Sequence, residues 1–172
     1  MEFSQLIEER YSVRKFKQQH LPQEVISRIL DAAHKAPTGC NYQPQRILVL
    51  NSGEAMEKLK GCTKCHFNAP TAMLVCYEKN ESWTRKYDGA LSAPVDAAIV
   101  TTYLMLAAQN EGVGSCWVMY FDPAAMRETF AIPESVEPTA LLVMGYPAED
   151  SAPMDLHNQF RPMSDVVFYD RF

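Results

Sequence analysis

The apolar residues of this chain recur at helical spacing in some stretches and run continuously in others. Between Pro22 and Pro37 they appear at every third or fourth position, which predicts a helix with a proline in its first turn. Residues 93–111 are apolar on almost every side, so they predict a long central helix that ends at Gly112. Shorter helices are predicted just before Arg10, over residues 52–60 and over residues 123–130.

Continuous apolar runs predict buried strands between these helices. The predicted strands cover residues 47–50, 71–77, 115–120 and 139–144.

The chain has 172 residues, 47% of them hydrophobic, and contains no internal repeats or linkers, so we expect a single domain over residues 1–172. Residues 148–172 lack a core pattern, so we expect an extended tail that packs on a partner or on the protein's own surface.

Charge and cysteine content narrow the class of protein further. The net charge is −5 and there is no run of Lys or Arg, which argues against a nucleic-acid partner. Apolar runs of transmembrane length are missing as well, and the first residues lack the features of a signal peptide. An odd number of cysteines, five, fits a reducing compartment. We therefore expect a cytoplasmic protein with free thiols and no membrane partner.

Several common site chemistries lack their motifs in this sequence. Neither a G-x-G-x-x-G turn after a strand nor a G-x-x-x-x-G-K-[ST] loop is present, and the four histidines are scattered, so we expect no metal site. Cys62-Thr63-Lys64-Cys65-His66 formally matches a haem-attachment pattern, and its cysteines could also be a redox pair or half a zinc site. We interpret it instead as a loop with two free thiols. Cys76 and Cys116 lie in apolar runs and are expected to be core residues.

The segment Arg10-Tyr11-Ser12-Val13-Arg14 has the composition of a phosphate clamp. It places two guanidinium groups, hydroxyls and backbone N–H groups within five residues. Guanidinium forks match phosphate oxygens and form charge-assisted hydrogen bonds. The competing interpretation is that both arginines pair on the surface with acids such as Glu8 or Glu9.

A second polar segment, residues 36–44, is suited to a flat heterocycle. It contains turn residues and two amide side chains, Asn41 and Gln43, that can hydrogen-bond a ring edge. The competing interpretation is that these amides cap their own backbone. Cys40 lies inside this segment, where its sulfur could approach a bound ring or could simply fill the turn.

Five blocks in this order resemble the flavin-dependent nitroreductase family across nearly the whole chain. The resemblance implies an α+β fold, with a central, mostly antiparallel sheet flanked by helices. It also implies an intertwined homodimer with two FMN sites at the subunit interface. The blocks are Arg10-x-Ser12-x-Arg14, Ala36-Pro37-Thr38-x-x-Asn41-x-Gln43-Pro44, the helix into Leu106–Trp117, Leu141–Pro147, and Arg161-Pro162.

The same resemblance assigns site residues in three groups. The first holds the FMN phosphate and ribityl chain. The second is presented by one subunit to the flavin of the other. The third runs beside the isoalloxazine ring near its N5 atom. The first group is Arg10, Tyr11, Ser12, Arg14 and Arg161; the second is Pro37, Thr38, Gly39, Asn41 and Gln43; and the third is Trp117, Val118, Met119 and Tyr120.

The resemblance further implies an oxidoreductase that takes electrons from NAD(P)H and reduces nitroaromatics, quinones or similar small oxidants by a ping-pong mechanism. Met119 and Tyr120 stand where many relatives have small residues, so bulk there could narrow the pocket. There is also little sequence for a long lid between Tyr77 and Ala93, which leaves the region of Trp83 and Tyr87 to control access to the flavin. Two alternatives remain open: a flavoenzyme acting on enones, halogenated aromatics or flavin, and a non-catalytic FMN-binding protein.

Overall fold

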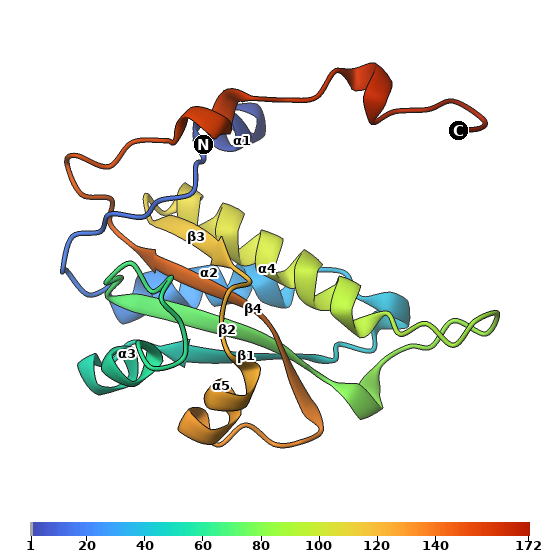
Figure 1. The fold of residues 1–172 in the computed structure, drawn as a ribbon, viewed down its shortest axis with the longest axis horizontal. Helices are drawn as coiled ribbons and strands as arrows, with labels where there is room; N and C mark the ends of the chain where they lie inside the picture. Colours follow the sequence, from blue (N-terminus) through green and yellow to red (C-terminus); the bar gives the residue numbers. More distant parts are fainter. Residues whose placement is uncertain (1) are drawn as a thin grey trace.

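The computed structural model describes residues 2–172 and contains one antiparallel sheet with helices on both faces. The strand order is β1-β2-β4-β3, with β2 and β4 in the centre (Figure 1). This arrangement confirms the α+β class with an antiparallel sheet. The strands are β1 (Gln45–Leu50), β2 (Thr71–Glu78), β3 (Gly114–Val118) and β4 (Val136–Gly145).

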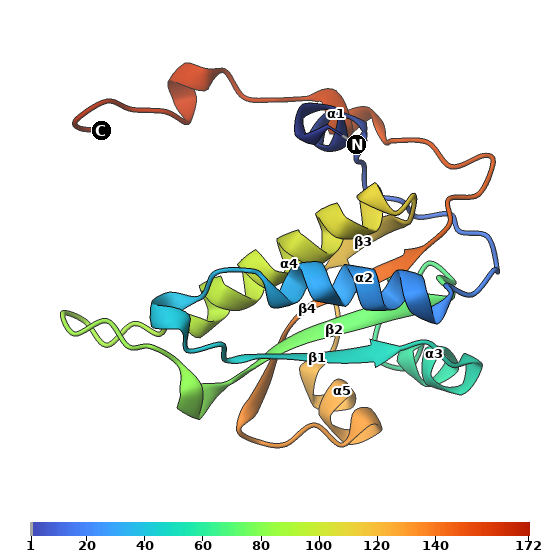
Figure 2. The same cartoon turned by 180° about the vertical axis from the view of Figure 1, so that it is seen from behind.

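Helices α2 and α4 cover one face of the sheet, and α3 and α5 lie on the other (Figure 2). Strand β2 explains this division because its side chains alternate: Met73 and Val75 pack with α2 and α4, whereas Ala72 and Leu74 pack with α3 and α5. The helices are α1 (Phe3–Glu9), α2 (Gln23–His34), α3 (Gly53–Leu59), α4 (Ala93–Asn110) and α5 (Pro123–Phe130).

The predicted helices are all present, with small shifts at their ends. Pro22 is the N-cap residue of α2 and so precedes the helix by one position instead of occupying its first turn. Gly112 follows α4 in the left-handed region, with φ of 72°, which suits a residue without a Cβ. Ser52 caps α3 by accepting a hydrogen bond from the Ala55 N–H.

Two strand predictions need correction. Strand β1 is an edge strand, and its residues 47–49 are half-buried instead of fully buried. The strand predicted over residues 115–120 ends at Val118, and Met119 and Tyr120 lie beyond it with 64% and 70% exposure. The chain leaves the sheet there because the Asp122 N–H bonds the Cys62 carbonyl oxygen, at 2.8 Å, outside the sheet.

The segment after α1 lies along the outer edge of β3. Ser12 forms a parallel bridge with Ser115, and the Val13 N–H donates to the Ser115 carbonyl oxygen at 2.9 Å. Farther along, Phe16 bridges Pro147. This edge placement determines which way the residues of the predicted clamp face.

A narrow hairpin, residues 83–92, projects beyond the N-terminal end of α4 (Figure 1). Its base is held by the Ser92 N–H, which donates to the Trp83 carbonyl oxygen at 2.9 Å, and Thr84 bridges Leu91. At the turn, Asp88 pairs with Arg85 at 2.5 Å, and Tyr87 is 99% exposed.

The C-terminal tail crosses α1 and then extends away from the body (Figures 1 and 2). It contains two short 3₁₀ turns, Asp155–Asn158 and Met163–Asp165, and residues 158–172 are exposed throughout. The extended conformation agrees with the prediction for this segment. Within residues 2–172, no helix has the length and apolarity needed to cross a lipid bilayer.

Candidate functional site

The clamp segment is fixed by backbone contacts on both sides of its arginines. Arg10 follows α1 directly, and its N–H donates to the Leu6 carbonyl oxygen at 3.2 Å. Val13 is 1% exposed and packs against Gly114. A Cβ on Gly114 would come within 2.6 Å of Val13 Cγ2, so the close approach of the segment to β3 requires glycine at this position.

The two guanidinium groups of the clamp have no acidic partners within residues 2–172. The Arg14 side chain donates to the Ser12 carbonyl oxygen at 3.1 Å, and its Cζ lies 6.0 Å from the centroid of the Phe67 ring. Arg10 is half-buried. The surface-pair interpretation of these arginines is therefore wrong, and both remain available for an anion.

Tyr11 points from the clamp toward the tail. Its hydroxyl donates to Ser151, with 3.1 Å to Oγ and 3.3 Å to the carbonyl oxygen. The ring also meets His157 edge-on, with centroids 6.4 Å apart. Arg161 lies farther along the tail, exposed, and forms no ion pair within the described chain.

The end of β3 presents a mixed apolar surface next to the clamp. Val118 is buried, and Trp117 is half-buried against the α2–α4 side of the core. The indole N–H of Trp117 donates to Met119 Sδ at 3.3 Å. Met119 and Tyr120 follow with most of their side chains exposed.

The second predicted segment forms the connection between α2 and β1 and includes the 3₁₀ turn η1 (Gly39–Asn41). We call its residues 37–43 the η1 segment. Three of its residues, Cys40, Asn41 and Gln43, have φ between 49° and 58°; asparagine adopts this region readily, but it is uncommon for Cys and Gln and marks local strain there. Pro37 is exposed and Thr38 is half-buried.

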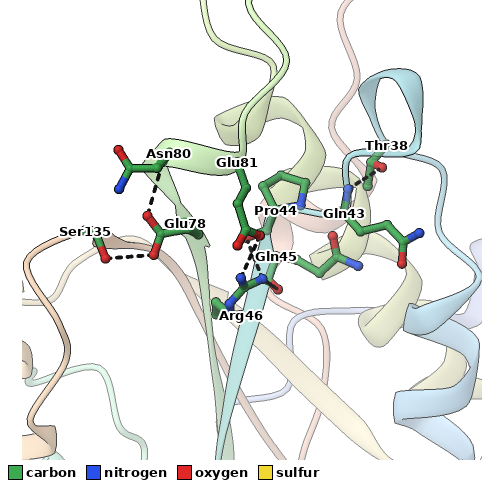
Figure 3. Close-up of polar contacts among 9 residues, drawn as sticks. All are labelled: Thr38, Gln43, Pro44, Gln45, Arg46, Glu78, Asn80, Glu81 and Ser135. Carbon is green, nitrogen blue, oxygen red and sulfur yellow. Dashed lines mark hydrogen bonds and ion pairs between the residues drawn. The ribbon is translucent and has the colours of Figure 1, made fainter.

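The amides of this segment do not cap their own backbone. The Gln43 N–H donates to Thr38 Oγ1 at 3.1 Å, whereas the Gln43 side chain extends away from the loop (Figure 3). Neither the Asn41 nor the Gln43 side chain has a hydrogen-bond partner within residues 2–172. Thr38 thus supplies the cap, and both amides stay free for a ligand.

Ion pairs and hydrogen bonds hold the surroundings of this segment. Arg46 on β1 pairs with Glu81 at 2.6 Å, and the Glu78 carboxylate accepts from Ser135 Oγ at 2.7 Å and from the Asn80 N–H at 3.1 Å (Figure 3). These hydrogen bonds lower the pKa of Glu78. The Arg46–Glu81 ion pair ties the start of β1 to the chain that leads into the hairpin.

A residue that the sequence analysis missed also fixes this loop. Asp96, in the first turn of α4, is 2% exposed and accepts a hydrogen bond from the Gly39 N–H at 2.8 Å. The one signal for it in the sequence was a carboxylate in a helix that is otherwise apolar on almost every side.

The clamp and the η1 segment lie at opposite ends of α4 (Figure 1). The N-terminal turn of α4 contacts Gly39, and the residues that follow its C-terminus begin β3 beside Ser12. The helix has 18 residues and therefore spans about 27 Å. The two halves of the predicted site therefore lie at separate ends of the chain's longest helix.

All five cysteines are free thiols. Cys62 is buried, with its Sγ 3.8 Å from the Lys58 carbonyl oxygen and 3.5 Å from Thr129 Oγ1. Burial raises the pKa of Cys76 to about 12 and also raises the pKa of Cys116. Within residues 2–172, no group of three His, Cys, Asp or Glu side chains could hold a metal ion.

Fold and site together define an α+β protein with an unpaired arginine clamp beside the edge strand of an antiparallel sheet. A family model described as the nitroreductase family matches residues 7–75 and 62–146. The chain belongs to the nitroreductase family.

Individual relatives agree with this assignment. A solved nitroreductase family protein from Clostridium difficile 630 is 38% identical, with both chains covered completely and a TM-score of 0.93. An NADH dehydrogenase from Thermus thermophilus is 26% identical over 176 residues, covering 84% of this chain and 86% of that protein. An FMN reductase [NAD(P)H] from Bacillus subtilis is 26% identical over 159 residues, covering 82% of this chain and 64% of that protein.

Proposed function

We propose that this protein is an FMN-dependent oxidoreductase that takes electrons from NAD(P)H and reduces small oxidants such as nitroaromatics or quinones. The observation that carries the proposal is the pair of guanidinium groups, Arg10 and Arg14, which face no acid within the described chain and flank the Ser12 backbone. Two such groups with an adjacent hydroxyl fit a terminal phosphate.

The residues of this chain bind and orient the cofactor. Arg10, Ser12 and Arg14 hold its phosphate, and Trp117 and Met119 line one side of its ring. When bound, FMN supplies the redox chemistry that connects NAD(P)H to the oxidant. The exposed Met119 and Tyr120 side chains leave this surface open to small molecules. NAD(P)H and the oxidant then occupy the same place in turn, which gives ping-pong kinetics.

The working form is a homodimer. Because the clamp and the η1 segment lie at opposite ends of α4, the amides of Asn41 and Gln43 reach a flavin held by the clamp of a second copy. This arrangement explains why both amides have no partner within one chain. Arg161 adds a further cation to the phosphate when the tails pack in the dimer.

Apolar surface supports the same assembly. A groove of about 590 Å³ between α1, α2 and α4 is lined largely by apolar side chains, among them Phe3, Leu6 and Tyr103. The tail carries further exposed apolar residues, which a second copy would cover. They are Met154, Leu156, Phe160, Met163, Val166, Val167, Phe168, Tyr169 and Phe172. The five free thiols favour a reducing compartment such as the cytoplasm.

The test is the visible absorbance spectrum of the purified protein, incubated with FMN and desalted, before and after anaerobic addition of NADH and then NADPH. We expect a flavin spectrum that bleaches with at least one nucleotide and returns when a nitroaromatic or a quinone is added. A spectrum that persists with both nucleotides would favour a non-catalytic FMN-binding protein. A colourless protein would refute the proposal.

A further inference from the structure

The structure links the η1 segment and the hairpin of residues 83–92 through one buried carboxylate. We propose that Asp96 is a positioning residue that holds these two elements in the arrangement needed to cover the flavin of a second copy. This inference rests on the proposed function for its consequence, but the local arrangement can be measured without any cofactor.

Both oxygens of the Asp96 carboxylate are used. Oδ1 accepts from the Gly39 N–H at 2.8 Å, and Oδ2 accepts from Ser92 Oγ at 2.8 Å. The side chain is 2% exposed, so neither bond competes strongly with water. Its position in the first turn of α4 also places the negative charge at the favourable end of the helix dipole.

The elements that Asp96 joins are packed without spare room. A Cβ on Gly39 would lie 2.8 Å from Ser92 Oγ and 3.4 Å from the Cβ of Trp83. Ser92 in turn bonds the Trp83 backbone at the base of the hairpin. A shift of the hairpin base would therefore push directly on the η1 segment.

The η1 segment needs an external support because its own conformation is strained. Cys40, Asn41 and Gln43 all have positive φ, and such a conformation persists only where the surrounding structure holds it. Of the side chains outside residues 37–43, Asp96 is the one in the described chain that hydrogen-bonds the backbone of this segment. Removing it should let the segment relax, and the free amides would lose their fixed positions.

The experiment compares three variants by hydrogen exchange of the FMN-free protein and by FMN titration. Asp96→Ala removes both hydrogen bonds. Asp96→Asn keeps them, because its amide oxygen can accept from Gly39 and its NH₂ can donate to Ser92. Thr101→Val is the matched control, since Thr101 is fully buried on the same helix and bonds only the Ala97 carbonyl oxygen, at 2.7 Å.

We expect Asp96→Ala to speed exchange in residues 37–43 and to weaken FMN binding about tenfold, because both hydrogen bonds that hold the segment are lost. Asp96→Asn should stay within about twofold of the wild type in FMN affinity, and Thr101→Val should leave exchange of the segment unchanged. If Asp96→Ala fails to fold, Ser92→Ala, which removes one of the two bonds, should still speed exchange of the segment.

Unchanged exchange of residues 37–43 in a folded Asp96→Ala protein, or in Ser92→Ala if the first variant does not fold, would overturn the inference. Equal loss in Asp96→Asn and Asp96→Ala would also overturn it, because the isosteric amide should restore the contacts. If the wild type itself binds no FMN, the proposed function fails, whereas the exchange data still decide the role of Asp96.

Discussion

The hydroxyl of Thr63 donates a hydrogen bond of 2.5 Å to the carbonyl oxygen of Tyr120. Thr63 is 6% exposed, and its Oγ1 also accepts from the Cys65 N–H at 3.0 Å. Beside it, the Asp122 N–H bonds the Cys62 carbonyl oxygen. The loop that carries the two cysteines thus anchors the segment after β3, which lies next to the proposed flavin ring.

Replacing Thr63 with Val should therefore lower the free energy of unfolding by about 1–3 kcal/mol, because two backbone groups lose their shared partner. Urea denaturation, followed by circular dichroism, measures this change. Thr63→Ser is the matched variant, since it keeps the hydroxyl, and it should retain most of the stability. A Thr63→Val protein as stable as the wild type would show that the hydrogen bonds of this hydroxyl contribute little, and a loss confined to Thr63→Ser would point to the methyl group instead.

Loss of a clamp guanidinium should weaken FMN binding selectively. Arg10→Ala is expected to reduce FMN affinity about 10- to 100-fold, because a charge-assisted bond to phosphate contributes about 1.5–3 kcal/mol. Arg14→Lys keeps the charge but loses the planar fork, so it should also bind more weakly. Fluorescence titration with FMN measures both. Lys17→Ala, an exposed cation nearby with no ion pair in the described chain, is the control and should bind normally.

The position of the clamp depends on the absence of a side chain at Gly114. Gly114→Ala should displace residues 10–14, because the new Cβ would lie 2.6 Å from Val13 Cγ2 and 3.0 Å from Pro147 Cγ. We expect a loss of about 1–3 kcal/mol in unfolding free energy together with weaker FMN binding. Gly53→Ala is the control, since a Cβ added at Gly53 would meet no other atom within 4 Å. Normal FMN affinity in Gly114→Ala would show that the clamp does not need this contact.

The sequence predicts most of the fold because its local signals are strong. Helix α5 occupies the predicted residues 123–130, since Asp122 caps it through the N–H groups of Ala124 and Ala125 and Pro123 begins it. The edge position of β1 could not be predicted, because an apolar run does not reveal how many neighbours the strand has. The end of β3 at Val118 was missed because it depends on a bond to the distant Cys62.

For the same reason, the sequence alone allows only part of the candidate site to be proposed. The two polar segments are visible as local motifs, and the structure shows that their guanidinium and amide groups are free of the competing partners. Their separation along α4 is a tertiary property that no local motif contains. Asp96 was missed because its partners, Gly39 and Ser92, come from two other segments of the chain.

The five thiols should differ sharply in reactivity. Burial raises the pKa of Cys76 from 9.0 to about 12, so this thiol stays protonated and inaccessible in the folded protein, and Cys116 is shifted in the same direction. Cys40 is exposed and should react first with a thiol reagent at pH 8.5. Because the unfolded thiols ionise near pH 9, stability should fall as the pH rises from about 9 to 12. Rapid labelling of Cys76 in the native protein, followed by mass spectrometry, would contradict this assignment.

The exposed tail gives the most direct test of the homodimer. A chain that stops after Asn158 keeps the contact between Tyr11 and His157 but lacks the apolar residues from Phe160 onward. If a second copy covers those residues, this truncation should shift the protein from dimer to monomer at micromolar concentration in analytical ultracentrifugation. Its circular dichroism spectrum should stay native, because residues 159–172 are exposed and add no strand or α-helix to the body. A truncated protein that remains dimeric would place the interface on the groove between α1, α2 and α4 alone, and a full-length monomer would refute the homodimer.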